Sequence, residues 1–349
     1  MRRVTRGSQF EGRPLALGIL GTGYISALFV DAIARSTAVD VVCVASRDKA
    51  TAAAFAERHR IGHAHGGYEA LLDDQRIDAV YIGLPNSLHA EWATRAAQAG
   101  RHVLCEKPLA PSLTEARRMR AAAERTGVVL LEAFPFHFQP QTLEIVRRIE
   151  AGEIGTVRLV QASTGFAVSS AGSIRLSREL AGGALLDVGC YPVSLARLIF
   201  GARPVEVDAA MECGEAAVDL TTVATLHHRA GGLAQIACSI AVGPHRCAML
   251  CGSAGAIETA FSNHTESGTN ASFRIKRGTD FGAPFERIET GAGNGFQFEA
   301  EAFARLVRSD DRSEAIARLA MSLDTVATMD AIRESARNRS RALVQDPRE

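Results

Sequence analysis

The sequence predicts an α/β protein of two domains. The first would hold a parallel sheet covered by helices on both faces, and the second a large, mostly antiparallel sheet with helices on one face. Two observations lead to this prediction. Short apolar runs alternate with helical patterns up to about residue 134, and strand-like runs then follow one another without helices between them. The 349 residues suffice for two domains with ample core.

The first domain is expected over residues 14–133. Its expected strands are Leu15–Leu20, Val39–Ala45, Ala79–Leu84, His102–Cys105 and Val128–Ala133. Its expected helices are Ile25–Arg35, Ala50–Arg60, Ala90–Ala99 and Leu113–Thr126. Strands separated by helices of about 10 to 15 residues indicate βαβ units and a parallel sheet. The strands contain few polar residues, as is typical of strands buried on both faces.

The second domain is expected over residues 134–338. Its expected strands are Thr156–Ala162, Val205–Met211, Ala217–His227, Gly232–Ile240, Arg246–Cys251 and Ala256–Ala260. Its expected helices are Leu143–Ala151, Val188–Phe200, Phe296–Arg308 and Ile316–Ser335, and the last of them could return to the first domain. Residues 1–13 lack an apolar signal-peptide core and are expected to be a disordered lead-in. Residues 339–349 are expected to be a charged tail.

Composition argues against several classes of partner. Lys+Arg and Asp+Glu both number 39, so no general field attracts nucleic acid or an anionic membrane. No apolar run approaches the roughly 18 residues that span a bilayer. The seven cysteines form no CxxC pair and the histidines have no ligand spacing, so we expect neither disulfides nor a metal. Free thiols of this kind favour the reducing cytoplasm.

A glycine-rich turn is the clearest motif. Gly21, Thr22 and Gly23 follow the first strand, and Tyr24 and Ile25 open the first helix. Glycines at such a junction let a dinucleotide pyrophosphate approach the backbone amides and the positive end of the helix. The third position of this fingerprint is Ser26 rather than Gly or Ala. Its place in the first βα turn predicts a dinucleotide site.

The end of the second strand indicates which dinucleotide is bound. Ser46 and Arg47 stand where an acidic residue would bind the ribose of NAD, and a hydroxyl with a guanidinium suits a 2′-phosphate. Asp48 follows and could support an NAD interpretation, but we favour a role as N-cap of the next helix. NADP(H) is therefore the expected cofactor, in preference to NAD(H).

Two further strand ends carry candidate residues. Leu84, Pro85, Asn86 and His89 would line the ribose and pyrophosphate, although Asn86 or Ser87 could instead cap the following helix. Lys107 ends the fourth strand, and Pro108 restricts its backbone. The carboxyl ends of strands in open α/β sheets are where ligands bind. The chain has only three lysines, and a lysine, unlike arginine, shifts its pKa readily.

These features together resemble the Gfo/Idh/MocA oxidoreductase family, over roughly residues 15–335. The segments that carry the resemblance are Glu106-Lys107-Pro108, Glu132-Ala133-Phe134, Pro140-Gln141, the stretch from Gly182 to Pro192, and that from Asn294 to Glu299. The resemblance implies a Rossmann domain followed by an α/β domain with a large open sheet. It also implies Glu106 and Lys107 beside the cofactor, and a homodimer or homotetramer formed through that sheet.

Asp187 and Tyr191 belong to a predicted helix, where residues four apart share a face. Many relatives carry His at the tyrosine position. A tyrosine there is similar to the subgroup that contains NADP-dependent xylose dehydrogenases, dihydrodiol dehydrogenases and glucose-fructose oxidoreductase. That subgroup usually reads Glu-Ala-Phe-Met-(Tyr/Trp)-Arg, whereas this chain has Pro135, Phe136 and His137. His137 either binds substrate or covers the domain junction.

The resemblance implies hydride transfer between a nicotinamide and a carbinol or carbonyl carbon of a sugar, glycoside or cyclic polyol. Tyr191 would be the acid/base, its phenol pKa lowered from about 10 by the Lys107 cation. Lys107 would polarise the reacting oxygen, and Asp187 would orient Lys107 or hold a substrate hydroxyl. The roles of Lys107 and Tyr191 could be exchanged. Two alternatives stay open: a dinucleotide sensor without turnover, and a redox-assisted glycosidase that retains NAD.

Overall fold

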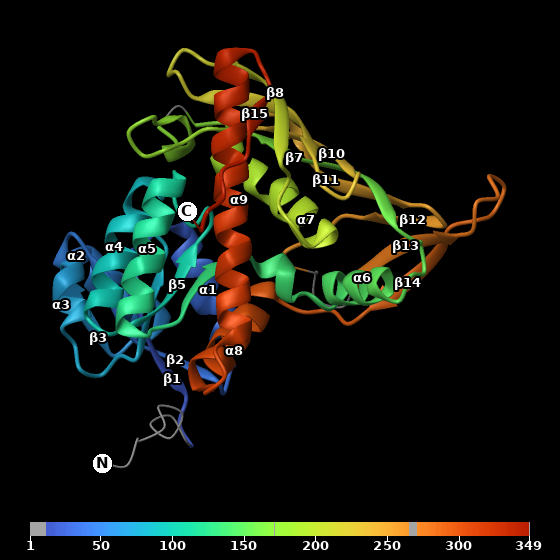
Figure 1. Cartoon of the computed structure of the whole chain (residues 1–349). Coiled ribbons are helices and arrows are strands. Elements are labelled where there is room, and N and C mark those ends of the chain that lie inside the picture. The colour runs from blue at the N-terminus through green and yellow to red at the C-terminus, as the bar shows by residue number, and fades with distance from the viewer. Residues whose placement is uncertain (1–11, 171, 265–270, 349) are drawn as a thin grey trace. The chain divides into compact units, whose positions relative to one another are not determined.

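The protein forms two compact units in the computed structural model, which describes residues 12–170, 172–264 and 271–348. Unit 1 combines the chain up to Ala110 with Thr114–Pro135 and Asn294–Leu319. Unit 2 combines Pro111–Leu113, Phe136–Gly293 and the chain from Ala320 onward. Figure 1 draws the chain of both units, coloured from blue at the N-terminus to red at the C-terminus. The segment 294–319 thus groups with the first sheet, and most of the expected lead-in lies outside the described residues.

Unit 1 contains a six-stranded sheet, in the order β3-β2-β1-β4-β5-β6, whose neighbouring strands are all parallel. The predicted doubly wound Rossmann sheet is therefore confirmed. The strands are β1 (Leu15–Leu20), β2 (Val39–Ser46), β3 (His63–Gly66), β4 (Ala79–Ile82), β5 (His102–Glu106) and β6 (Leu130–Ala133). The helices are α1 (Tyr24–Ile33), α2 (Lys49–His59), α3 (Tyr68–Leu72), α4 (Asn86–Gln98), α5 (Leu113–Thr126) and α8 (Gly295–Arg308).

Local sequence explains where these elements begin. β1 lies between β2 and β4, and all six of its residues are buried. Asp48 caps α2, since its carboxylate accepts from the Thr51 backbone N–H at 2.7 Å, and the favoured N-cap interpretation is confirmed. α4 begins at Asn86 after Pro85 and has no side-chain cap, so the alternative in which Asn86 or Ser87 caps this helix is wrong.

Unit 2 contains a nine-stranded sheet in the order β14-β13-β12-β11-β7-β10-β9-β8-β15. Only the pair of β7 with β10 is parallel, which confirms the mostly antiparallel sheet. The strands are β7 (Val157–Ala167), β8 (Glu206–Cys213), β9 (Asp219–His227), β10 (Leu233–Ser239), β11 (Ala241–Gly252), β12 (Gly255–Thr259), β13 (Ala271–Arg277), β14 (Glu286–Thr290) and β15 (Ala342–Leu343).

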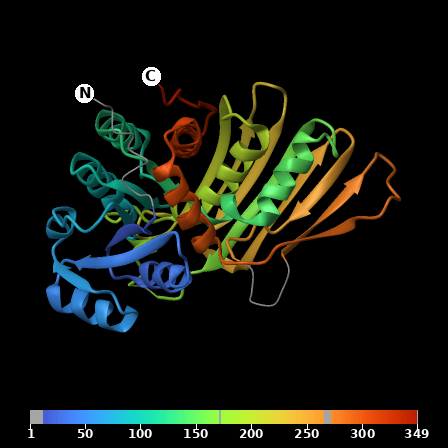
Figure 2. The ribbon, with the colours of Figure 1, turned by 90° about the horizontal axis from the view of Figure 1, so that it is seen from below.

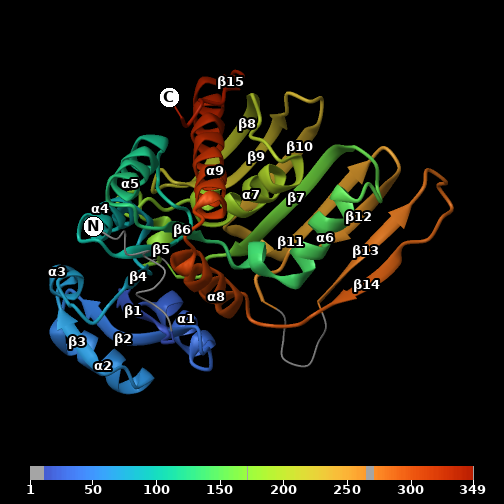
Figure 3. The same ribbon diagram turned by 60° about the horizontal axis from the view of Figure 1, so that its bottom comes forward.

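Helices cover one face of this sheet. They are α6 (Pro140–Glu150), α7 (Cys190–Phe200) and the part of α9 (Ser313–Asn338) that belongs to unit 2; α6 and α7 are seen against the strands in Figures 2 and 3. The expected tail contains β15, which pairs with β8, so the view of residues 339–349 as a mere tail is corrected. No helix in the described part of the chain combines the length and apolar character needed to cross a membrane.

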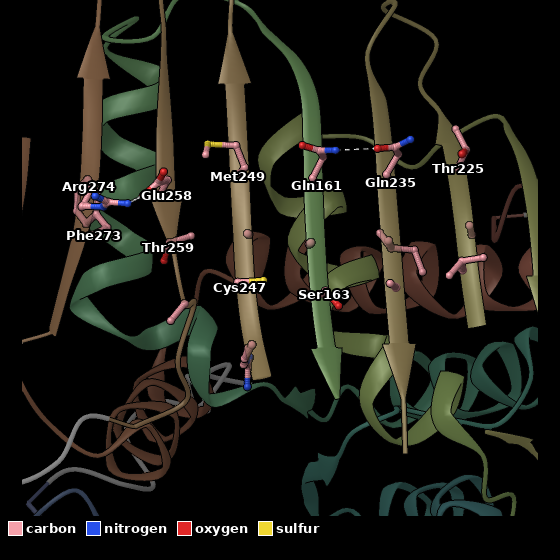
Figure 4. A pocket seen from close by; sticks show the side chains of 18 of the residues that line it. Gln161, Ser163, Thr225, Gln235, Cys247, Met249, Glu258, Thr259, Phe273 and Arg274 are labelled. Carbon is pink, nitrogen blue, oxygen red and sulfur yellow. Dashed lines mark hydrogen bonds and ion pairs between the residues drawn. The ribbon is translucent and has the colours of Figure 1, made fainter. Parts of the chain in front are cut away.

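The other face of the sheet carries small and polar side chains. Along β7, Val160 and Ala162 are buried beneath the helices, whereas Gln161 and Ser163 alternate with them. Figure 4 shows Gln161, Gln235 and Met249 standing on neighbouring strands, with helices behind the sheet. These side chains line a hollow of about 1110 Å³, and Gln161 donates to Gln235 at 2.8 Å.

Three buried carboxyl groups lie in the part of unit 1 that the structure describes. Tyr81 on β4 donates its hydroxyl to Glu106 at 2.7 Å, and the Leu109 backbone N–H donates to Glu132 at 2.6 Å. Glu299 on α8 is fully buried, and neither of its oxygens has a hydrogen-bond partner among the described residues. Burial raises the pKa of Glu299 well above its usual range, and the charge of Glu106 adds to this effect. We therefore expect Glu299 to hold its proton to a higher pH than an exposed glutamate does.

Glu299→Gln tests this protonation state. A group whose pKa is raised by folding contributes stability that is fully present below its unfolded pKa, about 4.3, and is lost as the pH rises toward the folded value. Since glutamine does not titrate, the variant should gain stability over the parent protein as the pH rises above about 4.3. The gain should reach at most about 1.4 kcal/mol per pH unit. Urea unfolding at a series of pH values measures it.

The matched control is Glu150→Gln, at the exposed end of α6, which should leave the pH dependence unchanged. Parallel stability curves for Glu299→Gln and the parent protein would show that Glu299 is ionised in the fold.

Candidate active site

The glycine-rich turn leaves the start of α1 open. Gly21 has a φ of +100°, and an added Cβ would lie 2.8 Å from the Gly83 carbonyl oxygen, so only glycine fits there. An added Cβ at Gly23 would meet no atom within 4 Å, although Gly23 is the N-cap of α1. No side chain caps the helix, and its first turn has no acidic residue. Free amides and a positive helix end therefore face open space, as a pyrophosphate requires.

Ser26 takes the third position of the fingerprint without loss of close packing. Its side chain is fully buried, and a Cβ added to Gly83 would lie only 2.3 Å from the Ser26 Oγ. Helix α1 thus packs closely against the end of β4 because Gly83 is small. Thr22 and Ile25 are half-buried beside this turn, and Tyr24 is 79% exposed at the start of the helix.

The end of β2 presents a free cation. Ser46 is half-buried and Arg47 is exposed, and the structure records no ion pair for Arg47 among the described residues. The carboxylate of Asp48 is occupied by the Thr51 backbone N–H and hydroxyl, both at 2.7 Å. The arrangement fits a 2′-phosphate at Arg47 better than a ribose hydroxyl at Asp48.

His89 joins the two other predicted loops of unit 1. The residue is fully buried, with Nδ1 lying 2.8 Å from the Pro108 carbonyl oxygen and Nε2 lying 2.8 Å from that of Leu84. Its ring therefore supports the Leu84-Pro85-Asn86 loop and the loop after β5, and is not exposed to a ligand. Burial lowers the pKa of His89, although both carbonyl groups oppose this effect.

Lys107 directly follows β5, at the carboxyl end of the parallel sheet. It is half-buried, the Lys107–Pro108 peptide is cis, and its backbone N–H donates to the Glu106 carboxylate at 3.2 Å. Glu106 is buried and holds both this amide and the Tyr81 hydroxyl. A primary amine is thus presented at the edge where the glycine turn and the end of β2 also lie.

In unit 2 a π-helical turn, η4 (Leu185–Gly189), precedes α7. Asp219 anchors its start by accepting from the Leu185 backbone N–H at 2.7 Å. A Cβ on Gly189 would lie 2.7 Å from the Cys238 sulfur, so glycine lets the turn pack on β10. The helix expected from Val188 therefore begins as a π turn, of a kind frequent at functional sites.

Tyr191 lies in the first turn of α7 and is 8% exposed. Its hydroxyl accepts a hydrogen bond from Asn263 Nδ2 at 3.1 Å. The guanidinium carbon of Arg246, on β11, lies 4.1 Å from the centre of its ring. The phenol is therefore held by groups from two other elements of the sheet domain.

Asp187 and His137 have partners of their own within unit 2. Asp187 forms a 2.6 Å ion pair with Arg175, and His137 Nε2 lies 2.9 Å from the Ser194 hydroxyl, one turn after Tyr191. Asp187 and Tyr191 are four residues apart, and Asp187 lies in the π turn whereas Tyr191 lies in α7. The roles predicted for Asp187 and His137 toward substrate stay predictions.

Sequence reasoning missed several residues that the fold brings together. Asn263 and Arg246 were not singled out, although both contact Tyr191. Cys43, His65 and Asp74 also meet, with one ligand atom of each within 4.8 Å of the others. Asp74 binds Arg76 through both carboxylate oxygens, at 2.7 and 2.8 Å, and a guanidinium there opposes a metal cation.

Comparison with known proteins matches both parts of the chain. A family described as an oxidoreductase family with an NAD-binding Rossmann fold matches residues 15–134, and the GFO/IDH/MocA C-terminal domain matches residues 142–258. The chain is 35% identical, over 328 residues, to a D-xylose 1-dehydrogenase (NADP(+)) of Haloferax volcanii, covering 92% of this chain and 97% of that one. It is 37% identical to a trans-1,2-dihydrobenzene-1,2-diol dehydrogenase of Danio rerio over 70% of this chain and 74% of that one.

A solved structure agrees with these matches. The fold is similar to that of a 3-ketoreductase from Actinomadura kijaniata in complex with NADP and TDP-benzene, with a TM-score of 0.84 and 31% identity. That match covers 93% of this chain and 98% of the ketoreductase. The predicted resemblance, the fold class and the enzyme class are thereby confirmed. The chain belongs to the Gfo/Idh/MocA family of oxidoreductases.

Proposed function

We propose that the protein is an NADP(H)-dependent oxidoreductase acting on a carbinol or carbonyl carbon of a sugar, glycoside or cyclic polyol. The observation that carries the proposal is the open glycine turn at α1 together with Arg47, which has no recorded ion pair, at the neighbouring strand end. The named relatives support the substrate class, since they include a D-xylose dehydrogenase and a dihydrodiol dehydrogenase.

The nucleotide would lie on residues of unit 1. Amides at Gly21, Thr22 and Gly23, with Tyr24 and Ile25 opening α1, would hold the pyrophosphate. Ser46 and Arg47 would hold the 2′-phosphate. Leu84, Pro85 and Asn86 would lie along the ribose and pyrophosphate. His89 would hold their loop in place, and Glu106 would hold the backbone at Lys107. When bound, the nicotinamide supplies or accepts the hydride.

The chain's own residues would move the proton that accompanies the hydride. Tyr191 would give its phenolic proton to the substrate oxygen in reduction and take one back in oxidation. Lys107 would stabilise negative charge on that oxygen. The proposal requires both residues at one substrate, with Asp187 and His137 contacting the substrate hydroxyls.

We also propose that the chain forms a homodimer or homotetramer through the uncovered face of the unit 2 sheet, and acts in the cytoplasm. Val223 and Leu233 are 47% and 43% exposed on that face, beside the hollow that Gln161 and Met249 line. Apolar side chains of this kind are suited to a second copy of the same sheet. The seven cysteines are free thiols, which favours a reducing compartment.

The cofactor assignment is tested by measuring oxidation of NADPH and NADH against a panel of aldoses, ketosugars and oxo-glycosides. Parent protein should prefer NADPH. Arg47→Ala should raise the KM for NADPH about ten- to hundredfold and leave that for NADH nearly unchanged, because a charged hydrogen bond is worth about 1.5–3 kcal/mol. The control is Arg58→Ala, at an exposed arginine in the last turn of α2.

Three outcomes of this panel contradict the proposal. A preference for NADH would overturn the reading of Arg47. Binding of NADPH without turnover of any carbonyl would indicate a sensor, and tightly retained NAD without net turnover would indicate a redox-assisted glycosidase.

Tyr191→Phe and Lys107→Met test the catalytic roles. Each should lower kcat about 10²- to 10⁴-fold, since each removes a group that acts on the reacting oxygen. Tyr191→Phe should still bind NADPH, as measured by its fluorescence. Near-normal turnover in either variant would refute the role given to that residue.

The proposed assembly is tested by light scattering. Parent protein should have the mass of two or four chains, and Val223→Glu with Met249→Glu should reduce it to one chain by placing charges in the interface. Phe281→Glu, at a side chain 98% exposed outside this face, is the control. A parent protein that is monomeric, or a double variant with unchanged mass, would rule out this surface.

A further inference from the structure

Arg246 is half-buried as a residue, but the Nε and Nη2 atoms of its guanidinium are buried and aromatic rings lie around it. Its guanidinium carbon lies 4.1 Å from the ring centre of Tyr191, 4.5 Å from that of Phe261 and 5.5 Å from that of Phe136. The register explains this position, since Arg246 lies on the same face of β11 as Ala248 and Leu250, which are buried on the helix-covered side. The guanidinium therefore points into the core of unit 2, under the first turn of α7.

No carboxylate balances this charge among the described residues. The Nε and Nη2 atoms of Arg246 are buried and have no hydrogen-bond partner there. The acidic group of η4, Asp187, is paired with Arg175. A buried cation without a counter-ion is costly, and aromatic faces offset only about 2 kcal/mol of that cost.

The ionisable group in contact with Arg246 is the Tyr191 phenol. Burial lowers the pKa of Arg246 to about 10, and charge attraction to Tyr191, with a further contribution from the Cys190 thiol, opposes this effect. Attraction between two charges is mutual, so a guanidinium that is stabilised by a phenolate also stabilises that phenolate.

The other groups around Tyr191 are uncharged or have partners of their own. Asn263 donates to the phenolic oxygen but carries no charge. His137 on the preceding 3₁₀ turn bonds to Ser194, Cys190 on α7 contacts the Asp187 carbonyl, and Asp187 itself is neutralised by Arg175. Arg246 is the arginine that lies against the ring.

We propose that Arg246 is a positioning residue for Tyr191, holding its ring by stacking and stabilising its phenolate as the missing counter-ion. This rests on the proposed function of Tyr191 as acid/base. In carbonyl reduction the phenolic O–H bond breaks as an O–H bond forms on the substrate oxygen, while the hydride comes from the reduced nicotinamide. The negative charge left on Tyr191 then lies beside Arg246. In oxidation the same phenolate accepts the proton.

The test is an ultraviolet titration of tyrosinate, which requires no turnover. The chain has four tyrosines, and burial raises the pKa of both Tyr68 and Tyr81, so their ionisation falls at high pH. The signal of Tyr191 is the difference between parent protein and Tyr191→Phe. It should show ionisation below about 10, the usual value for tyrosine. A Tyr191 midpoint at or above 10 in the parent protein would overturn the proposal, and no variant of Arg246 is needed to see it.

Variants of Arg246 then measure how much of the lowering of the Tyr191 pKa is due to Arg246. Arg246→Met, which fills the site without charge, should move the midpoint up by at least one unit, a tenfold change in the ionisation constant. Arg246→Lys keeps the positive charge but loses the planar group that stacks on the ring. Its Tyr191 midpoint should lie between those of the parent protein and Arg246→Met. Arg274→Met, on the same sheet, is the control because Arg274 is exposed and paired with Glu258. Equal midpoints in parent protein and Arg246→Met would refute the proposal.

The pH profile of kcat separates this inference from the proposed function. If Tyr191 is the acid/base, the profile of Arg246→Met should shift by the same amount as the titration. If Tyr191→Phe retains activity, the proposed function fails while a shifted titration still supports the pairing with Arg246. Should Arg246→Met fail to fold, as judged by circular dichroism, the titrations of parent protein and Arg246→Lys decide the question.

Discussion

The absence of a side chain at Gly21 is the constraint on which the first unit depends. With β1 buried between two strands, the chain must leave the sheet in a left-handed conformation and pass directly over the Gly83 carbonyl. Only then can α1 start with free amides and pack Ser26 against Gly83. Because Gly21 and Gly83 both lack side chains, the end of β4 lies close to the glycine turn. A site for an extended anion is thus a consequence of how closely the backbone packs.

In unit 2 the corresponding constraint is the anchoring of η4. Asp219 holds the first amide of the turn, and Gly189 permits its contact with β10. Helix α7 follows this π turn directly. Tyr191 in α7 contacts Arg246 on β11 and Asn263, whereas Asp187 in the π turn pairs with Arg175. The spacing of Asp187 and Tyr191 alone suggests a shared partner, but the local helix geometry assigns them different contacts.

The strands that are most deeply buried were the ones whose bounds the sequence predicted best. Strands buried on both faces, such as β1, were predicted at their observed bounds, because an apolar run has one interpretation there. β3, with four residues and two histidines at a sheet edge, was missed, as were β13 and β14, which alternate charged and apolar residues. Motif residues in unit 1 were found by their spacing. Arg246 was missed because the sequence sign of its position is its spacing: it lies two and four residues before Ala248 and Leu250, and therefore on the same face of the strand.

Glu299 and Arg246 both place ionisable atoms in the core without a hydrogen-bond partner among the described residues, and the same electrostatics has opposite outcomes for them. Glu299 can lose its charge by holding a proton, so the core tolerates it without a partner. Arginine does not do this at neutral pH, since even a pKa of about 10 leaves it charged there. Its position in the core must be balanced by something that can become negative. Tyr191, whose ring lies against the guanidinium, meets this condition once it has given up its proton.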